Sequence, residues 1–128
     1  MLISFDHIVQ NYGVPRGIIH IGAHLMEERP GYMRHGLSNT IWIEANPELY
    51  AIIVNKISDA EKVFNYAIGE TSDIPTTLYC TNNSQSSSTL PLGTHKVYYP
   101  DILVSHTKEV MSQRVDNIIS KYNISIKN

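Results

Sequence analysis

The stretch Ile18-Ile-His-Ile-Gly-Ala-His24 decides the fold class of this 128-residue chain. Its first four residues form a short, largely apolar run, which is typical of a buried parallel strand, and the glycine that follows predicts a tight turn. A second run of the same kind, Thr40-Ile-Trp-Ile-Glu44, comes after a helical segment. We therefore expect two parallel strands that end at the same edge of one sheet.

Helical patterns alternate with these strands. Residues 4–13 predict a short helix that begins at an N-capping serine, and residues 25–35 predict a helix interrupted at Pro30. Asn46-Pro47 predicts the start of another helix, with an N-cap followed by proline at the first helical position. The apolar residues at helical spacing predict its buried face: Leu49, Ile52, Ile53 and Ile57.

Residues 62–68 predict a third strand, so the order is β-α-β-α-β. This order is typical of a parallel sheet with right-handed crossovers, the doubly wound α/β class. After Gly69 the pattern changes, and residues 76–81 and 108–115 predict a β-hairpin-like excursion before a final helix from Val115 to Tyr122. We expect one domain over residues 1–128. The serine-rich residues 82–89 fit a flexible linker or a functional loop equally well.

The composition excludes several classes of protein. Hydrophobic residues make up 42% of the chain, which supports a packed core, and a net charge of −2 argues against a nucleic-acid-binding surface. The single cysteine, Cys80, leaves no internal disulfide and no thiolate zinc cluster. There is no apolar run of the ~20 residues that span a bilayer and no visible signal peptide. We expect a cytoplasmic protein without membrane or nucleic-acid partners.

Two residues at the expected strand ends point to a ligand. In doubly wound folds, ligands lie beyond the carboxyl ends of the strands. Gly22 lets a ligand approach the backbone closely, and Glu44 can accept both hydroxyls of a ribose. Glu44 lies 22 positions after Gly22, close to the ~20-residue spacing expected for this pair. The spacing predicts a site for an adenosine-type ligand.

The residues between them indicate which ligand. A dinucleotide site has the pattern Gly-x-Gly-x-x-Gly, but here the three positions are Gly22, His24 and Glu27. The carboxylates of Glu27 and Glu28 would repel a pyrophosphate, whereas they favour a cation. S-adenosylmethionine carries a cationic sulfonium and no phosphate, so the charge pattern favours this methyl donor over a dinucleotide or a nucleotide sugar.

Five blocks of sequence resemble FkbM-type methyltransferases, in the order and approximate spacing of that family. The blocks are Ile21-Gly-Ala-His-Leu-Met-Glu-Glu28, Ile43-Glu-Ala-Asn-Pro-Glu-Leu49, Asn65-Tyr-Ala-Ile-Gly69, Ser86-Ser-Ser-Thr-Leu90 and Tyr99-Pro-Asp-Ile102. The resemblance implies a Rossmann-like methyltransferase fold. It also implies transfer of a methyl group from S-adenosylmethionine, often to a sugar hydroxyl, with a small molecule or a glycan as the acceptor.

The resemblance also implies roles for single residues. Gly22, Ala23 and His24 would line the methionine side of the donor site, and Glu44 would hold the ribose. Ala45 and Asn46 would lie alongside the adenosine, and Asn65 and Ala67 near the adenine. The charge argument adds Glu27 to this set. Two positions depart from the family pattern: Met26 stands where the family usually has glycine, and His20 where it often has an acidic residue.

Several alternatives stay open. A metal site at His20, His24, Glu27 and Glu28 is disfavoured, because these residues lack a helical His-Glu-x-x-His arrangement. No catalytic residue can be assigned, although His95 or His106 could act as a general base. The alternative function is a truncated or degenerate methyltransferase-fold module that binds a cofactor or a partner without turnover.

The expected fold is also incomplete. The family's acidic fourth-strand motif does not occur in residues 116–128. We therefore expect an open edge at the third strand, completed by a second copy of the chain or by another chain.

Overall fold

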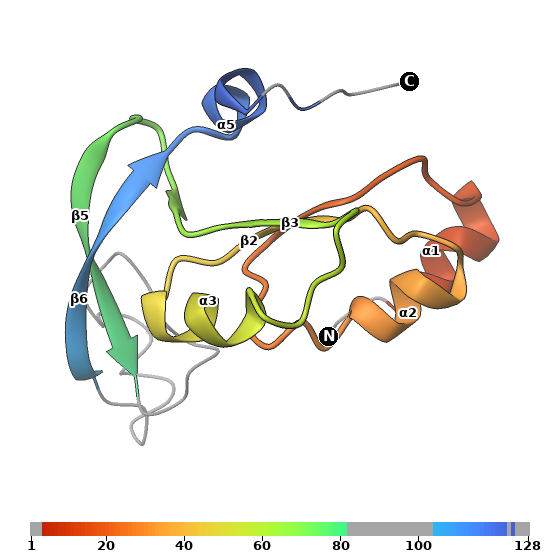
Figure 1. The fold of residues 1–128 in the computed structure, drawn as a ribbon, viewed down its shortest axis with the longest axis horizontal. Coiled ribbons are helices and arrows are strands. Elements are labelled where there is room, and N and C mark those ends of the chain that lie inside the picture. The colour runs from red at the N-terminus through yellow and green to blue at the C-terminus, as the bar shows by residue number, and fades with distance from the viewer. Residues whose placement is uncertain (1–3, 82–103, 123, 125–128) are drawn as a thin grey trace.

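The computed structural model describes residues 4–81, 104–122 and 124 of the chain (Figure 1). The helices are α1 (Phe5–Tyr12), α2 (Arg29–Arg34), α3 (Pro47–Ile53) and α5 (Val115–Lys121). The strands are β1 (Ile19–Ile21), β2 (Ile41–Ile43), β3 (Lys62–Phe64), β4 (Ala67–Ile68), β5 (Ile74–Thr81) and β6 (Val104–Gln113). The serine-rich stretch at 82–89, His95 and the block at 99–102 lie outside these residues.

The first sheet is parallel and has the order β1-β2-β3. Its central row of side chains is His20, Trp42 and Val63, which are partners in the register. This row faces the core that α2 and α3 help to form, and the buried members of that core are Ala23, Met26, Tyr32, Leu37, Trp42 and Ile53. The predicted α/β class with a parallel sheet and flanking helices is confirmed.

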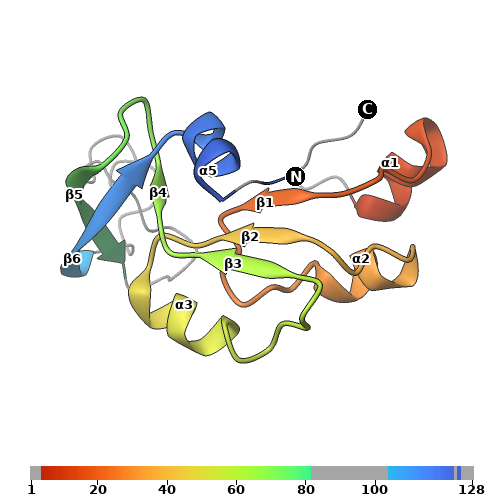
Figure 2. The ribbon, with the colours of Figure 1, turned by 45° about the horizontal axis from the view of Figure 1, so that its top comes forward.

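Helix α5 covers the opposite face of this sheet. The ring of Tyr122, which ends α5, lies 4.3 Å from the ring of Phe64 at the end of β3. Ile118 of the same helix is almost fully buried. Figure 2 shows α5 on one side of the sheet and α3 on the other, so the sheet lies between helices on both faces.

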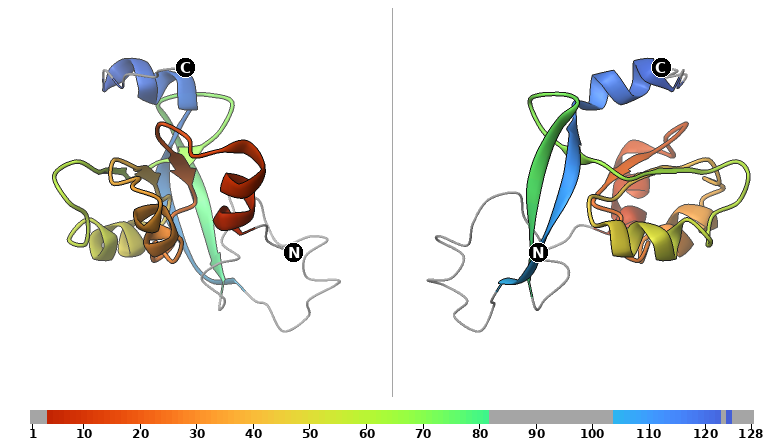
Figure 3. Two further views of the ribbon diagram at one scale, coloured as in Figure 1. Left: turned by 90° about the vertical axis from the view of Figure 1, so that its right-hand side faces the viewer. Right: turned by 60° about the vertical axis from the view of Figure 1, so that its left-hand side comes forward.

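A second sheet has the order β4-β6-β5, in which β6 pairs antiparallel with β5 and parallel with β4. Its core consists of Ala67, Leu78, Cys80 and Val110. Figure 3 shows the long β5–β6 hairpin next to the first sheet, and Figure 1 places it beyond the carboxyl ends of the parallel strands. The hairpin-like excursion is therefore present, with β5 starting at Ile74 and β6 at Val104 rather than at residues 76 and 108.

The prediction of a single strand over residues 62–68 is wrong. The chain leaves the first sheet after Phe64 and joins the second sheet at Ala67. The cause lies in Asn65, whose side-chain amide donates to the carbonyls of Glu44 and Ala45 at 2.8 and 2.9 Å. This side chain binds the backbone that follows β2, and β3 ends directly before it.

Two helix predictions also need correction. The helix expected over residues 25–35 spans only Arg29–Arg34, and Pro30 lies in its first turn, where proline is tolerated, rather than interrupting it. In α3, Ile53 is buried as expected, but Ile52 is 48% exposed. The expected open edge at β3 is present, since β3 pairs only with β2 among the described strands, and β1 is an edge strand of the same kind. In the part of the chain described, no helix has both the length and the apolar character needed to cross a membrane.

Candidate functional site

Glu44 follows β2 and is held by backbone groups from two loops. One carboxylate oxygen accepts a hydrogen bond from the His24 backbone N–H at 2.7 Å, and the other accepts from the Asn46 N–H at 2.8 Å. The residue is only 8% exposed. A buried carboxylate requires such partners, and hydrogen bonds to a charged group contribute about 1.5–3 kcal/mol each. Glu44 therefore joins the loop after β1 to the loop after β2.

The loop after β1 has an unusual backbone. Gly22 has a φ of +82°, and a Cβ added there would meet no atom within 4 Å. The glycine is thus required by the backbone conformation and not by crowding within the chain. The N–H groups of Gly22 and Ala23 both donate to the carbonyl of Ile43, at 2.8 and 3.1 Å, which fixes the turn to the end of β2.

His24 and Glu27 form a pair within this loop. The Nδ1 atom of His24 lies 2.9 and 3.0 Å from the two carboxylate oxygens of Glu27, and the Leu25 N–H donates to the same carboxylate at 2.9 Å. Partial burial raises the pKa of Glu27, but the hydrogen bonds from His24 and the backbone outweigh it and hold the pKa below its usual value. Glu27 is therefore ionised at neutral pH.

The two asparagines serve the backbone around Glu44. The side-chain oxygen of Asn46 accepts from the Glu48 N–H at 3.0 Å, which caps the start of α3. Asn65 donates to the carbonyls of Glu44 and Ala45, as described above. Three loops that follow β1, β2 and β3 are thereby connected around one carboxylate.

The structure therefore brings most of the predicted residues together at the carboxyl ends of the parallel strands: Gly22, His24, Glu27, Glu44, Asn46 and Asn65. The side chains of the other three, all alanines, lie elsewhere. Ala23 is fully buried in the core of the first sheet, and Ala67 is buried in that of the second, against which Ala45 also packs.

Comparison with known proteins identifies no relative. No family model, curated protein or solved structure matches the chain. The site therefore has to be interpreted from its own geometry.

Met26 contributes to the core rather than to the loop surface. It has a φ of +61°, a conformation that glycine adopts without strain, and it is only 3% exposed. Its side chain packs in the cluster that contains Tyr32 and Trp42. The departure from glycine at this position thus adds a buried apolar side chain.

A buried ionic cluster surrounds Glu61, which was not among the residues predicted from the sequence. Its carboxylate accepts hydrogen bonds from Arg29 Nη2 at 2.6 Å, from the Trp42 indole N–H at 2.9 Å and from the Ser58 N–H at 3.0 Å. Burial raises the pKa of Glu61, but the hydrogen bonds, led by that of Arg29, outweigh it and lower the pKa to about 2. One feature of the sequence could have indicated this cluster: the indole N–H of a buried tryptophan such as Trp42 needs a hydrogen-bond acceptor. This cluster joins α2, β2 and the start of β3.

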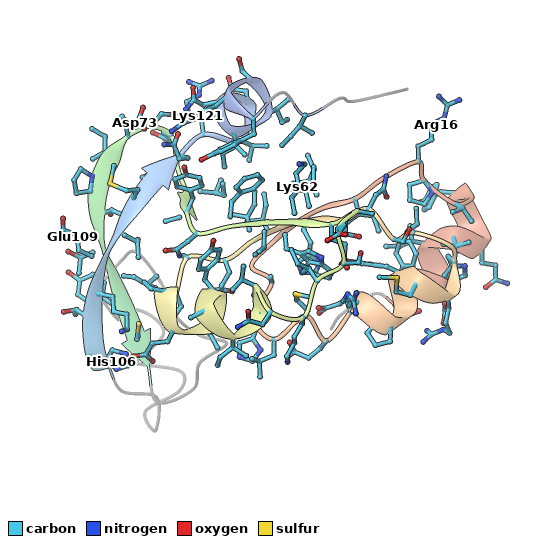
Figure 4. The ribbon with its side chains drawn as sticks, viewed as in Figure 1. Arg16, Lys62, Asp73, His106, Glu109 and Lys121 are labelled. Carbon is cyan, nitrogen blue, oxygen red and sulfur yellow. The ribbon has the colours of Figure 1, made fainter. Side chains whose placement is uncertain are left out.

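An ion pair joins the second sheet to α3. Lys108 Nζ of β6 lies 2.7 Å from the carboxylate of Glu48 in α3. His106, the candidate general base, is exposed near the outer end of the same strand (Figure 4) and contributes a smaller lowering of the Glu48 pKa than Lys108 does. Among the described residues, no group of three or more His, Cys, Asp or Glu side chains forms a candidate metal site.

Proposed function

We propose that this chain is an S-adenosylmethionine-dependent methyltransferase of the FkbM type, with a Rossmann-like fold. The acceptor would be a hydroxyl group of a sugar or glycan. The observation that carries the proposal is the Glu44 carboxylate, which lies at the carboxyl end of β2 and is bonded to the turn after β1. Ligands of doubly wound sheets bind in this region.

The Glu44 carboxylate retains capacity for a ligand. Each carboxylate oxygen can accept about two hydrogen bonds, and each oxygen of Glu44 accepts one from the backbone. The remaining acceptor positions suit the two adjacent hydroxyls of a ribose. The backbone bonds hold the carboxylate in place before a ligand arrives, so little conformational entropy is lost on binding.

The charge and shape of the loop favour a cationic ligand over a pyrophosphate. The turn at Gly22 does not lead directly into a helix, since α2 begins only at Arg29 and has no side-chain cap. The helix N-terminus that holds a pyrophosphate in dinucleotide sites is therefore lacking at this turn. The ionised Glu27 instead favours a positive group nearby.

The residues of this chain would act by holding and orienting the donor. When bound, S-adenosylmethionine supplies the electrophilic methyl group. Glu44 would fix the ribose, the backbone at Gly22 would allow close approach, and Glu27 would favour the positive charge. Methyl transfer of this kind gains mainly from alignment of the acceptor oxygen with the methyl group. We assign no general base among the described residues.

The test is a comparison of ligands and of two matched variants. Thermal-shift measurements with S-adenosylhomocysteine, NAD, ADP and a UDP-sugar should give stabilisation by S-adenosylhomocysteine alone. Glu44→Gln keeps a side chain of the same shape but removes the charge, and Glu109→Gln makes the same change on the exposed face of β6 (Figure 4). Calorimetry should find weaker binding by on the order of 1.5–3 kcal/mol for Glu44→Gln only. Equal binding by both variants contradicts the proposal.

The open edge of β1 favours a second candidate function. A doubly wound sheet places its ligand where strands on both sides of the first strand meet, and among the described strands β1 has a neighbour on one side only. A module of this kind would bind a cofactor or a partner without turnover. Transfer of labelled methyl from the donor to an oligosaccharide panel, measured on the dimer as well as on the monomer, separates the two functions, because a module without turnover labels no acceptor in either state.

A further inference from the structure

Among the described residues, the outer edge of β1 carries backbone groups that pair with no other strand. The carbonyl of Ile18 accepts from Ile41 N–H at 2.9 Å, and the N–H of Gly22 donates to the carbonyl of Ile43 at 2.8 Å, so even-numbered residues of this strand face β2. The backbone groups of Ile19 and Ile21 therefore point away from β2. Within the described residues β1 pairs with β2 only, and Ile21 is 52% exposed.

We propose that two copies of this chain pair through this edge, with their β1 strands antiparallel about a two-fold axis at His20. This register places Ile19 of each copy opposite Ile21 of the other. These are the residues whose N–H and C=O groups point outward, so each pair can exchange two hydrogen bonds. The result is a continuous six-stranded sheet made of two three-stranded sheets.

The side chains at this edge fit the same arrangement. Ile19 and Ile21 share the face of the sheet that carries their register partners Ile41 and Ile43. Pairing of two copies puts four isoleucine side chains of the two edges next to one another on that face. Burial of the exposed Ile21 side chain contributes to association at about 25 cal/mol per Å² of apolar surface removed from water.

Charges at the two ends of β1 favour a second copy in the antiparallel direction. Arg16, before β1, projects away from the chain (Figure 4) and makes no ion pair with any other described residue. The two-fold rotation brings the segment before β1, which carries Arg16, next to the loop after β1 of the second copy, in which His24 is bonded to Glu27. The Glu27 side chain is 46% exposed, so its carboxylate is accessible to a guanidinium.

This edge is complementary to itself because its basic end and its acidic end exchange places under the two-fold rotation. Each copy then contributes Arg16 to the rim of the loop that follows β1 in the other copy. A parallel strand from a different protein would gain the hydrogen bonds but not this symmetric pair of charges. The inference rests on the geometry of the edge and does not depend on the proposed methyltransferase function.

The first test is the oligomeric state of matched variants. Sedimentation equilibrium over a wide concentration range should find a dimer for the parent chain. Ile21→Lys puts two charges at the paired edge and should raise the dimer dissociation constant about tenfold or more. Ile52→Lys changes a similarly exposed isoleucine on α3 and should leave the dimer dissociation constant unchanged. A parent chain that stays monomeric, or a dimer insensitive to Ile21→Lys, overturns the proposal.

The second test addresses the register. Arg16→Glu should weaken the dimer, and the combination of Arg16→Glu with Glu27→Lys should restore it, because the charges are exchanged and not lost. Amide hydrogen exchange at Ile19 and Ile21 should slow as the chain concentration rises. A dimer that neither loses affinity with Arg16→Glu nor protects these amides pairs elsewhere, and the proposal is then wrong.

Discussion

Gly22, His24 and Met26 all have left-handed backbone angles in the loop between β1 and α2, with φ values of 82°, 52° and 61°. For a residue with a Cβ atom this conformation costs about 1–2 kcal/mol. The strain at His24 and Met26 is offset by defined contacts: the His24 N–H bonds to Glu44, and the Met26 side chain packs in the core. The loop is held in place by these contacts, which preorganises the region around Glu44.

Gly22 offers a direct test of the site because Gly36 has a similar backbone angle and similar free space. Their φ values are +82° and +78°, and an added Cβ meets no atom within 4 Å at either position. Gly22→Ala and Gly36→Ala should each lower the free energy of unfolding by about 1–2 kcal/mol, as measured by urea denaturation. Only Gly22→Ala should also weaken binding of S-adenosylhomocysteine in calorimetry. Binding that is equally strong in both variants would remove Gly22 from the site.

Met26→Gly separates two interpretations of the same residue. From the sequence alone, this substitution opens the turn, tightens S-adenosylhomocysteine binding and slightly destabilises the following helix. Its position in the core predicts otherwise, since loss of a buried methionine side chain costs about 2–5 kcal/mol and relief of the left-handed strain returns only about 1–2 kcal/mol. We expect a net loss of about 1–3 kcal/mol of stability, measured by urea denaturation, and no gain in affinity. Tighter binding would support the first interpretation.

At the scale of elements, the β-α-β-α-β order could be predicted because apolar runs and helical spacing persist over several residues. The ends of elements could not. Strand β3 ends at Phe64 because the amide of Asn65 binds two carbonyls directly after β2, which belong to residues 21 and 20 positions earlier in the chain. Helix α2 starts late because the preceding loop takes left-handed angles. The role of Glu44 as a partner of backbone N–H groups was likewise hidden, because it depends on where two loops meet.

The Glu61 cluster predicts how stability depends on pH. The carboxylate binds Arg29, Trp42 and Ser58, which connects α2, β2 and the start of β3. Its pKa of about 2 in the folded chain lies below the ordinary value of 4.5, so the folded state binds this proton less readily than the unfolded state. The contribution to stability, about 3 kcal/mol, is therefore complete above pH 4.5 and is lost as the pH falls from about 4.5 to 2.

This dependence can be measured by urea denaturation at a series of pH values. Glu61→Gln should be less stable than the parent chain at neutral pH, and its stability should fall less steeply between pH 4.5 and 2. Glu109→Gln, an exposed carboxylate on β6, should follow the parent curve. Parallel curves for the parent and Glu61→Gln would show that other carboxylates govern acid unfolding.

At the scale of the whole molecule, the first sheet lies between α2 and α3 on one face and α5 on the other, and the β5–β6 hairpin lies beyond the carboxyl ends of its strands (Figure 1). The candidate site therefore lies at the boundary between the two sheets, where Asn65 lies between β3 and β4 and Lys108 of β6 forms an ion pair with Glu48 of α3. Most polar groups at this boundary bind backbone or each other. Such groups are better suited to binding a methyl donor than to activating the hydroxyl of a methyl acceptor.

This distribution of polar groups predicts that the monomer binds the methyl donor but does not catalyse methyl transfer. The side chains of Asn46 and Asn65 are amides, which do not act as bases, and Glu44 is assigned to the ribose of the donor rather than to the acceptor hydroxyl. A monomer of this chain should bind S-adenosylhomocysteine but transfer no label from S-adenosylmethionine to an oligosaccharide panel. Light scattering on the same sample defines the species that is assayed. Robust turnover by the monomer would contradict this prediction and would place a general base among the residues of this chain, with His106 the first to substitute.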